Sequence, residues 1–345
     1  MMKKRMKQGG ALVIATALVV SAFVLPKSYA ATAIDTAAEC SVQINVPSEG
    51  FSELKNLEVP VNFYKVANVN VVGKYKAVAG FEAIKDVENV NSGTKTVEWE
   101  AFAAKAKEVV DAQIEAKTPI AVAATGVVQN GTLVVEDLEV GLYLVDAQVA
   151  SSDAYKYEFN PYLVSLPNNY YYQGYGDNWV YDLTGEKKSI GLKPEKSDRY
   201  GDLVIRKNLD AYNETIGGAT FVFQVEAVKT DVDTGNAKVV YSDVVSMTFK
   251  APGTDSITIK DIPAGAVVTV TEVYSGASYQ LTSDGTQKVI IVADDETSEE
   301  DEPVSVTFAN TYDGRSNGGN GVVNSFIYNE ENRSWTHSAT EDSTP

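Results

Sequence analysis

Hydrophobic and polar residues alternate along most of the chain, and this alternation is the pattern of half-buried β-strands. In the first part of the chain, residues 59–67 and 141–147 are predicted to be strands, and Asn130-Gly131 between the apolar runs of 127–135 predicts a hairpin turn. Across residues 97–116, by contrast, apolar residues recur every three or four positions, which predicts one helix packed on the core. Its apolar stripe comprises Trp99, Phe102, Ala103, Ala106, Val109, Val110 and Ile114.

The second part of the chain alternates in the same way and contains no helical window. Its candidate strands are residues 202–209, 219–228, 256–262, 266–274, 287–293 and 303–311. Short strands at this spacing, separated by turns, are typical of a β-sandwich. We therefore predict a predominantly all-β chain with two immunoglobulin-like sandwich domains in tandem, the first with one inserted helix.

Composition along the 345 residues predicts further divisions. A basic start, an apolar run over residues 11–25 and small residues at Ser28-Tyr29-Ala30 are typical of a cleaved export signal. The Gly/Asn/Ser-rich end predicts a loose tail, in which residues 322–328 are a candidate strand. The expected order is a signal peptide over 1–30, a first domain over 36–189, a linker over 190–199, a second domain over 200–314 and a flexible tail over 315–345.

The charge and the rare residues exclude several classes of site. With 29 Lys and Arg against 47 Asp and Glu, the net charge is −18, which argues against binding to nucleic acid or to an anionic membrane. One histidine, His337, leaves no multi-histidine metal site or histidine-dependent triad in the body of the chain, and one cysteine, Cys40, excludes an internal disulfide. Residues 231–236 resemble a calcium loop but lack its glutamate, because Ser242 stands there, so a plain turn is expected. We expect no cofactor and no metal.

Strand parity places three polar side chains on inward faces of the second domain. Lys207 shares the parity of Leu203, Ile205 and Leu209, whereas Arg206 points outward. Glu272 shares the parity of the apolar residues of 266–274, and Asn310 shares that of 303–311. Because burial of an unpaired charge costs several kcal/mol, these side chains need partners or chemistry.

Two interpretations account for the three residues. One is a buried Lys207–Glu272 ion pair with Asn310 as a hydrogen-bond partner. The other is an isopeptide bond: desolvation leaves the Lys207 amine neutral and Glu272 protonated, the amine attacks the Asn310 amide, and Glu272 shuttles the protons as ammonia leaves. This reaction occurs once per molecule, so the protein would not be a turnover enzyme.

The second domain resembles the isopeptide-linkage domain of Gram-positive pilins, which is related to the collagen-adhesin B-type repeat. The motifs that carry the resemblance are Val204-Ile205-Arg206-Lys207, Thr271-Glu272 and Val306-Thr307-Phe308-Ala309-Asn310-Thr311-Tyr312. The resemblance implies a collagen-adhesin-B-type sandwich in which Lys207 and Asn310 are cross-linked, with Glu272 as the catalytic proton shuttle. It also implies a bond between the first and last strands that lets a pilus bear tension.

The first domain is similar to the N-terminal domain of the same pilins, on motifs such as Phe63-Tyr64-Lys65-Val66-Ala67 and Asn160-Pro161-Tyr162-Leu163. Lys65 shares parity with Val61 and Phe63, and Asp146 shares parity with Leu142 and Leu144, so the two are candidates for a first-domain cross-link. No asparagine stands at the expected place in the late strand of 179–184. The alternative, an uncross-linked first domain, therefore stays open.

Two departures from the pilin pattern bear on assembly. Where polymerising pilins have a lysine after the first domain, this chain has Glu195, with Lys193 and Lys196 nearby but out of register. Residues 315–345 contain no sortase sorting signal, so the sequence leaves open how the chain is retained and whether it polymerises.

The leading hypothesis is a secreted, cell-surface structural subunit of a pilus or cell wall, with other pilus or surface proteins as partners and no membrane span in the mature chain. The alternative is a minor-pilin or secreted adhesin that binds a host glycan or matrix protein through aromatic side chains. The candidate contacts are Tyr170, Tyr171, Tyr172, Tyr175, Trp179 and Tyr181.

Overall fold

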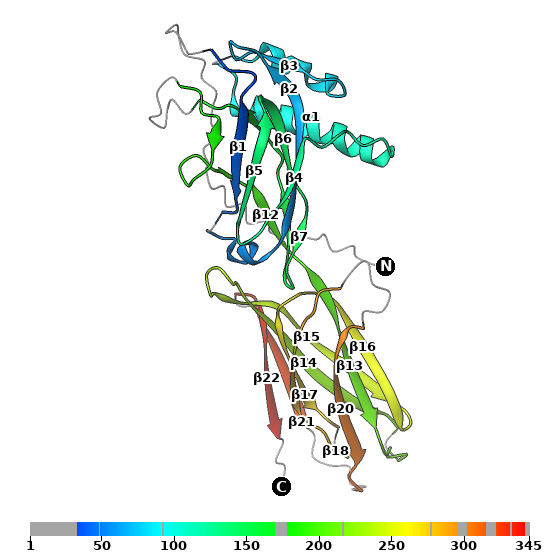
Figure 1. Ribbon diagram of the computed structural model, residues 1–345. Coiled ribbons are helices and arrows are strands. Elements are labelled where there is room, and N and C mark those ends of the chain that lie inside the picture. The colour runs from blue at the N-terminus through cyan, green and yellow to red at the C-terminus, as the bar shows by residue number, and fades with distance from the viewer. Residues whose placement is uncertain are drawn as a thin grey trace. The chain divides into compact units, whose positions relative to one another are not determined.

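The computed structural model describes residues 33–47, 49–91, 93–169, 178–215, 217–276, 278–294, 302–314, 322–331 and 333–341. The predicted signal peptide over 1–30 lies outside the described residues. The chain forms two compact units: the first runs up to Ser152 and includes Lys156–Ser197, and the second contains Asp153–Tyr155 and the chain from Asp198 onward. Strands dominate both, so the fold is predominantly all-β with a small helical part, as predicted (Figure 1).

Two sheets form most of the first unit. One has the order β10 (Asp182–Leu183), β1 (Glu39–Asn45), β11 (Ile190–Gly191), and β5 (Thr132–Glu139) also pairs with β1. The other has the order β3 (Tyr75–Ala77), β2 (Val59–Val69), β6 (Gly141–Ala147), β9 (Tyr162–Leu166), and β4 (Ala124–Val128) also pairs with β2. A smaller sheet has the order β12 (Pro194–Asp198), β8 (Tyr155–Phe159), β7 (Ala150–Ser151).

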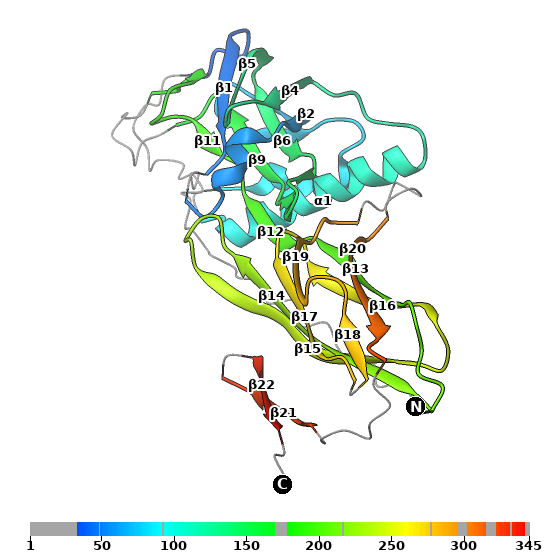
Figure 2. The ribbon, with the colours of Figure 1, turned by 90° about the horizontal axis from the view of Figure 1, so that it is seen from below.

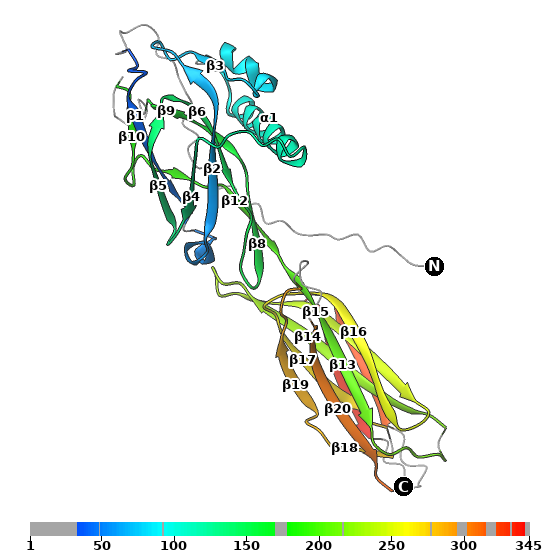
Figure 3. The same ribbon diagram turned by 45° about the vertical axis from the view of Figure 1, so that its right-hand side comes forward.

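One α-helix, α1 (Thr96–Glu115), packs against β9 and β6 (Figure 3). It begins where the Glu98 side chain accepts a hydrogen bond from the Lys95 backbone N–H at 2.7 Å, which satisfies one of the free donors of the first turn. The predicted helix is confirmed to within one residue at each end, and its core side chains are Trp99, Ala103, Ala106 and Val110. Ile114 is 52% exposed, so its assignment to the core stripe was wrong: the buried positions of the helix end at Val110. In the described part of the chain, the helical structure also includes the 3-10 helices η1 (Ser52–Asn56) and η2 (Glu82–Asn89).

The predicted turn at Asn130-Gly131 is present, but the hairpin is not a continuous ladder. Both residues have positive φ angles, 51° and 82°, as a two-residue turn of this type requires. Gln129 and Thr132 form a single bridge, after which β4 pairs with β2 and β5 pairs with β1. The turn therefore leads the chain from one sheet to the other.

The linker and the tail contain more structure than the composition indicated. Within the predicted linker 190–199, β11 pairs with β1 and β12 belongs to the sheet of β8. A polar edge strand has the same composition as a loop, so composition alone did not indicate these two strands. In the predicted tail, β21 (Val322–Asn329) pairs with β22 (Ser334–Glu341) (Figure 2), so the candidate strand over 322–328 is confirmed.

The second unit is a sandwich of two four-stranded sheets. One has the order β16 (Gly253–Pro263), β13 (Tyr200–Leu209), β20 (Val304–Tyr312), β18 (Tyr279–Leu281), and the other β15 (Ala237–Phe249), β14 (Ala219–Thr230), β17 (Val267–Tyr274), β19 (Thr286–Ile290). Every strand predicted for this part is present, although β19 ends three residues early, and β15 and β18 were missed. The inward residues of both sheets form one buried apolar core, which includes Phe221, Phe223 and Phe308.

Among the described residues, no helix has the length and apolar character needed to cross a bilayer.

Candidate functional site

In chain order, β13 is the first and β20 the last strand of the sandwich of two four-stranded sheets, and the two are parallel neighbours (Figure 1). In their register Lys207 lies opposite Phe308, and Leu209 lies opposite Asn310. The structure buries the side chains of Lys207 and Asn310 completely, as their parity predicts, whereas Arg206 is exposed. Strands far apart in the sequence thus bring an amine and a carboxamide together inside the sandwich.

Glu272 enters the same space from the other sheet. It lies on β17, paired with Phe223 of β14, and its side chain is 1% exposed. The parity argument therefore gives the correct face for this residue as well.

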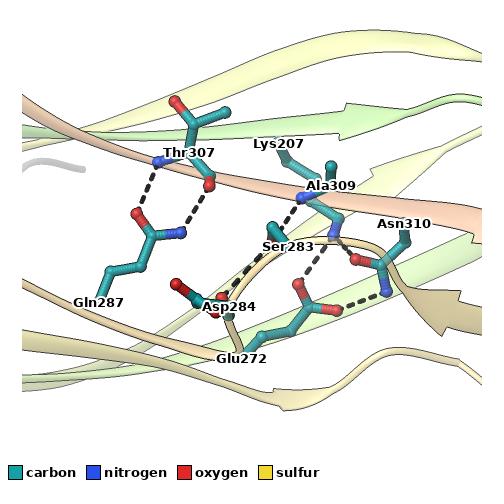
Figure 4. A network of polar contacts seen from close by, with 8 residues as sticks. All are labelled: Lys207, Glu272, Ser283, Asp284, Gln287, Thr307, Ala309 and Asn310. Carbon is teal, nitrogen blue, oxygen red and sulfur yellow. Dashed lines mark hydrogen bonds and ion pairs between the residues drawn. The ribbon is translucent and has the colours of Figure 1, made fainter.

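The three side chains contact one another directly, and we call them the Lys207–Glu272–Asn310 triad (Figure 4). The Lys207 amine, Nζ, donates to Oε2 of Glu272 at 2.8 Å and also to Oδ1 of Asn310. Nδ2 of Asn310 donates to Oε1 of Glu272 at 2.7 Å. The carboxyl group of Glu272 thus bridges the amine and the amide nitrogen, one on each oxygen.

Aromatic rings surround the triad and exclude water from it. Nζ of Lys207 lies 4.4 Å from the ring centroid of Phe221 and 5.9 Å from that of Phe223. The ring of Phe223 in turn packs on that of Phe308, with 5.1 Å between centroids. A cation near an aromatic face gains some electrostatic energy, but this gain does not replace hydration.

Burial acts on both ionisable groups of the triad. It lowers the pKa of Lys207, and the contact with Glu272 only partly offsets this effect. It raises the pKa of Glu272, against the opposing effects of Lys207 and Asn310. Both shifts favour the uncharged forms, a neutral amine beside a protonated carboxyl group.

The arrangement is chemically suited to transfer of an acyl group. A neutral amine is a nucleophile, the amide carbon of Asn310 is an electrophile, and a carboxyl group in contact with both nitrogens can move a proton from one to the other. A stable buried ion pair would use the same contacts, so the outcome depends on the protonation states.

The structure does not bring Lys65 and Asp146 together. Asp146 lies opposite Asn62, and Lys65 lies opposite Tyr143, so the two side chains are on opposite faces of the β2–β6 pair. Nζ of Lys65 contacts Oε2 of Glu139 at 2.6 Å, and Asp146 is 3.6 Å from Nζ of Lys107 on α1. The inference that Lys65 and Asp146 share an inward face was wrong. This sheet is covered on both sides, so residues on both of its faces are largely buried.

The aromatic stretch is only partly described. Tyr170, Tyr171, Tyr172 and Tyr175 lie outside the described residues. Trp179 packs close to Gly73, where an added Cβ would lie 3.4 Å from the indole ring, and the Tyr181 hydroxyl accepts a hydrogen bond from the Asp35 backbone N–H at 2.7 Å. The described members thus contribute to packing and hydrogen bonding in the first unit.

The remaining candidates have structural explanations. Asp231 accepts hydrogen bonds from the backbone N–H groups of Asp233 and Thr234, so the segment is a turn closed on its own carboxylate. In the part of the chain that the structure describes, no three His, Cys, Asp or Glu side chains converge as a metal site. Cys40 is buried on β1, and burial raises the pKa of its thiol to about 11.

Gln287 and Ser283 were not identified from the sequence, although both contact the strand of Asn310 (Figure 4). Gln287 shares its parity with Val289 and Ile291, so it is a polar residue on an apolar strand face. The criterion that selected Lys207, Glu272 and Asn310 would have selected Gln287 as well.

A family model described as "Domain of unknown function (DUF5979)" matches residues 203–313, which contain the whole triad. A search of curated proteins finds no match to the sequence. Among solved structures, the chain is similar to the shaft pilin SpaA of Lactobacillus rhamnosus GG, with 13% identity, 81% of this chain and 100% of that chain covered, and a TM-score of 0.28.

It is also similar to a streptococcal ancillary pilin, with 12% identity, 86% of this chain and 74% of that chain covered, and a TM-score of 0.25. A minor pilin of Streptococcus agalactiae shares 12% identity over 79% of this chain and 96% of that chain, with a TM-score of 0.20. These three are pilins, the family that the sequence motifs resemble.

Proposed function

We propose that the chain is a pilin-like structural subunit of a bacterial cell surface whose second unit forms an isopeptide bond between Lys207 and Asn310. The observation that carries this proposal is the buried Lys207–Glu272–Asn310 triad, in which the carboxyl group of Glu272 contacts the amine at 2.8 Å and the amide nitrogen at 2.7 Å. The motif resemblance to pilin isopeptide domains supports the same assignment.

The reaction exchanges one carbon–nitrogen bond for another. The lone pair of neutral Nζ of Lys207 attacks Cγ of Asn310, and a new Nζ–Cγ bond forms. Glu272 accepts the proton that Nζ loses and delivers a proton to Nδ2, which is hydrogen-bonded to its Oε1. The Cγ–Nδ2 bond then breaks, ammonia leaves, and Glu272 returns to its starting form. No oxidant, metal or cofactor enters the balance.

Folding supplies most of what the reaction needs. The sandwich holds amine, amide and acid in contact, so a bimolecular reaction becomes unimolecular, an advantage of about 7–11 kcal/mol in well-oriented systems. Burial also lowers the pKa of Lys207 and so favours the neutral amine, whereas an exposed lysine is protonated at neutral pH. The ion-pair alternative uses charged groups in the same apolar site and is disfavoured by both pKa directions.

The proposed bond suits a load-bearing role outside the cell. Cys40 is the single cysteine of the chain, so no internal disulfide can brace it. The isopeptide bond would join β13 directly to β20, and force applied across the unit would then pass through a covalent connection. We accordingly propose a secreted, surface-attached chain whose partners are other pilus or surface proteins.

The intact mass of the expressed protein tests the proposal. The wild type should be lighter than its sequence mass by one ammonia molecule, and Glu272→Ala should have the full sequence mass because no group is left to move the proton. Lys288→Ala, on the exposed side of β19, is the matched control and should lose ammonia as the wild type does. A wild-type protein of full mass would exclude the cross-link.

A further inference from the structure

The strand that carries Asn310 has one side that no strand fully covers. On that side, β18 pairs with β20 only from Asn310 to Tyr312. The backbone groups of Thr307 and Ala309 point toward the same side, beyond the end of β18. Unpaired backbone groups on a strand edge bind water or another strand. Their hydrogen-bond partners therefore matter for a nearby site that must exclude water.

The segment of residues 282–287 satisfies this edge with main-chain and side-chain groups (Figure 4). The Thr282 backbone N–H donates to the Ala309 carbonyl at 2.8 Å, and the Ala309 N–H donates to the Ser283 hydroxyl at 3.0 Å. Nε2 of Gln287 donates to the Thr307 carbonyl at 2.6 Å, and the Thr307 N–H donates to Oε1 of Gln287 at 3.3 Å. The carboxamide of Gln287 thus takes the place of a peptide group of a missing strand.

The same segment also holds the strand of Glu272. The Glu272 backbone N–H donates to the Gly285 carbonyl at 2.9 Å, and Gln287 itself lies on β19, opposite Val270 of β17. Glu272 and Asn310 belong to different sheets, whereas Lys207 and Asn310 are on neighbouring strands of one sheet. Residues 282–287 therefore form hydrogen bonds both with the backbone of Glu272 and with the backbone of Ala309, next to Asn310.

We propose that Gln287 is a positioning residue for the cross-linking reaction: its carboxamide holds β20 against the sheet of Glu272 and closes the strand edge beside Asn310. This inference rests on the proposed function. The hydrogen bonds of the Gln287 carboxamide go to the Thr307 backbone and not to a reacting atom, so Gln287 acts through the position of β20. Because small misplacements of reacting groups slow such reactions strongly, loss of this contact should be visible in the rate.

A time course of ammonia loss tests this inference. The full chain is produced by cell-free synthesis and sampled at intervals, and the cross-linked fraction is read from the intact mass. Gln287→Ala should form the bond about tenfold more slowly than the wild type, or slower still. Gln280→Ala is the matched control, because it removes the same carboxamide from the exposed face of β18, and it should keep the wild-type rate.

A second variant separates positioning from general loss of stability. In Gln287→Glu, a carboxylate at neutral pH still accepts from the Thr307 N–H but cannot donate to the Thr307 carbonyl. A protonated carboxyl group can do both, and an unperturbed glutamate has a pKa of about 4.3. The rate of this variant divided by the wild-type rate at the same pH should therefore rise toward one as the pH falls from about 7 to about 4.

The outcomes are distinguishable from those of the parent proposal. If the wild type never loses ammonia, the cross-link itself is excluded. If the wild type loses ammonia and Gln287→Ala does so at the same rate, the cross-link stands and the positioning role is overturned. A Gln287→Glu ratio that stays constant with pH would likewise overturn the positioning role.

Discussion

At the scale of single residues, the position of a lysine on its strand decides its chemistry. Arg206 and Lys207 are adjacent basic residues on β13, yet the first is exposed and the second is completely buried. Burial removes the hydration that stabilises a charge, so the pKa of Lys207 falls while that of Glu272 rises. Lys207 is therefore suited to attack an amide group, whereas the exposed Arg206 is not.

These pKa directions predict how the cross-linking rate depends on pH. In acid, Lys207 and Glu272 are both protonated, and the nucleophile is lost. In alkali, both are deprotonated, and no proton remains for the leaving nitrogen. The rate of ammonia loss by newly made protein should therefore be highest at intermediate pH and fall on both sides. A rate that rose steadily with pH, as for a freely exposed lysine, would contradict the role of Glu272.

The sequence was sufficient to find the triad, because each sheet of the second unit turns one face to the core. Lys207, Glu272 and Asn310 could then be placed by counting in twos along their strands. The same count failed for Lys65 and Asp146, since the β2–β6 sheet is covered on both faces and neither parity marks a single core. Gln287 carried the same signal as the triad and could have been found.

At the scale of elements, the buried Asp146 of β6 links the sheet of the first unit to helix α1. It is 3% exposed and lies 3.6 Å from Nζ of Lys107, which also contacts Asp111 on the same helix. Burial raises the pKa of Asp146 above its ordinary value, although Lys107 opposes the shift. The charged form of this side chain is therefore less stable in the folded chain than in water.

Asp146→Asn should accordingly stabilise the first unit at neutral pH. In the wild type, the folded state binds the proton of Asp146 more tightly than the unfolded state, so the stability falls as the pH rises from about 3.9 through the folded pKa. The uncharged amide avoids this loss, and Lys107 keeps Asp111 as its partner. The thermal unfolding midpoint of the variant should exceed that of the wild type at pH 7 but not in acid below the unfolded pKa. An unfolding midpoint at pH 7 below the wild-type value would show that the Lys107–Asp146 attraction outweighs burial.

The elements whose sequences have a clear hydrophobic pattern were predictable, and those without one were not. Helix α1 and strands β13, β14 and β17 follow patterns of one regular repeat, whereas β2 and β6 were found from their apolar runs. β15 was missed because seven successive residues, 239–245, are all partly buried and do not alternate, and β18 is only three residues long. The separation of β4 from β5 after their turn depends on pairing with β2 and β1, which no local pattern encodes.

At the scale of the whole molecule, the proposed bond should determine how the second unit extends under force. Lys207 and Asn310 are separated by 103 positions in the chain. Without a bond, unfolding of this segment releases about 340–370 Å of chain, at roughly 3.3–3.6 Å per residue. With the bond, tension passes from Lys207 directly to Asn310, and the chain between them is not extended.

Single-molecule pulling on the full chain should therefore show no extension step of this size for the wild type. Glu272→Ala, which keeps Lys207 and Asn310 but lacks the proton shuttle, should show the step of about 340–370 Å. A wild-type trace with the same step as Glu272→Ala would rule out a load-bearing bond between the two strands.

The most direct measurement of the central claim is peptide mapping of the denatured wild-type protein after digestion with trypsin. A Lys207 joined to Asn310 is no longer a cleavage site, so the map should contain a branched product of residues 207–229 and 289–315, lighter than the two peptides together by one ammonia molecule. Recovery of residues 208–229 and 289–315 as separate linear peptides, with cleavage after Lys207, would contradict the account.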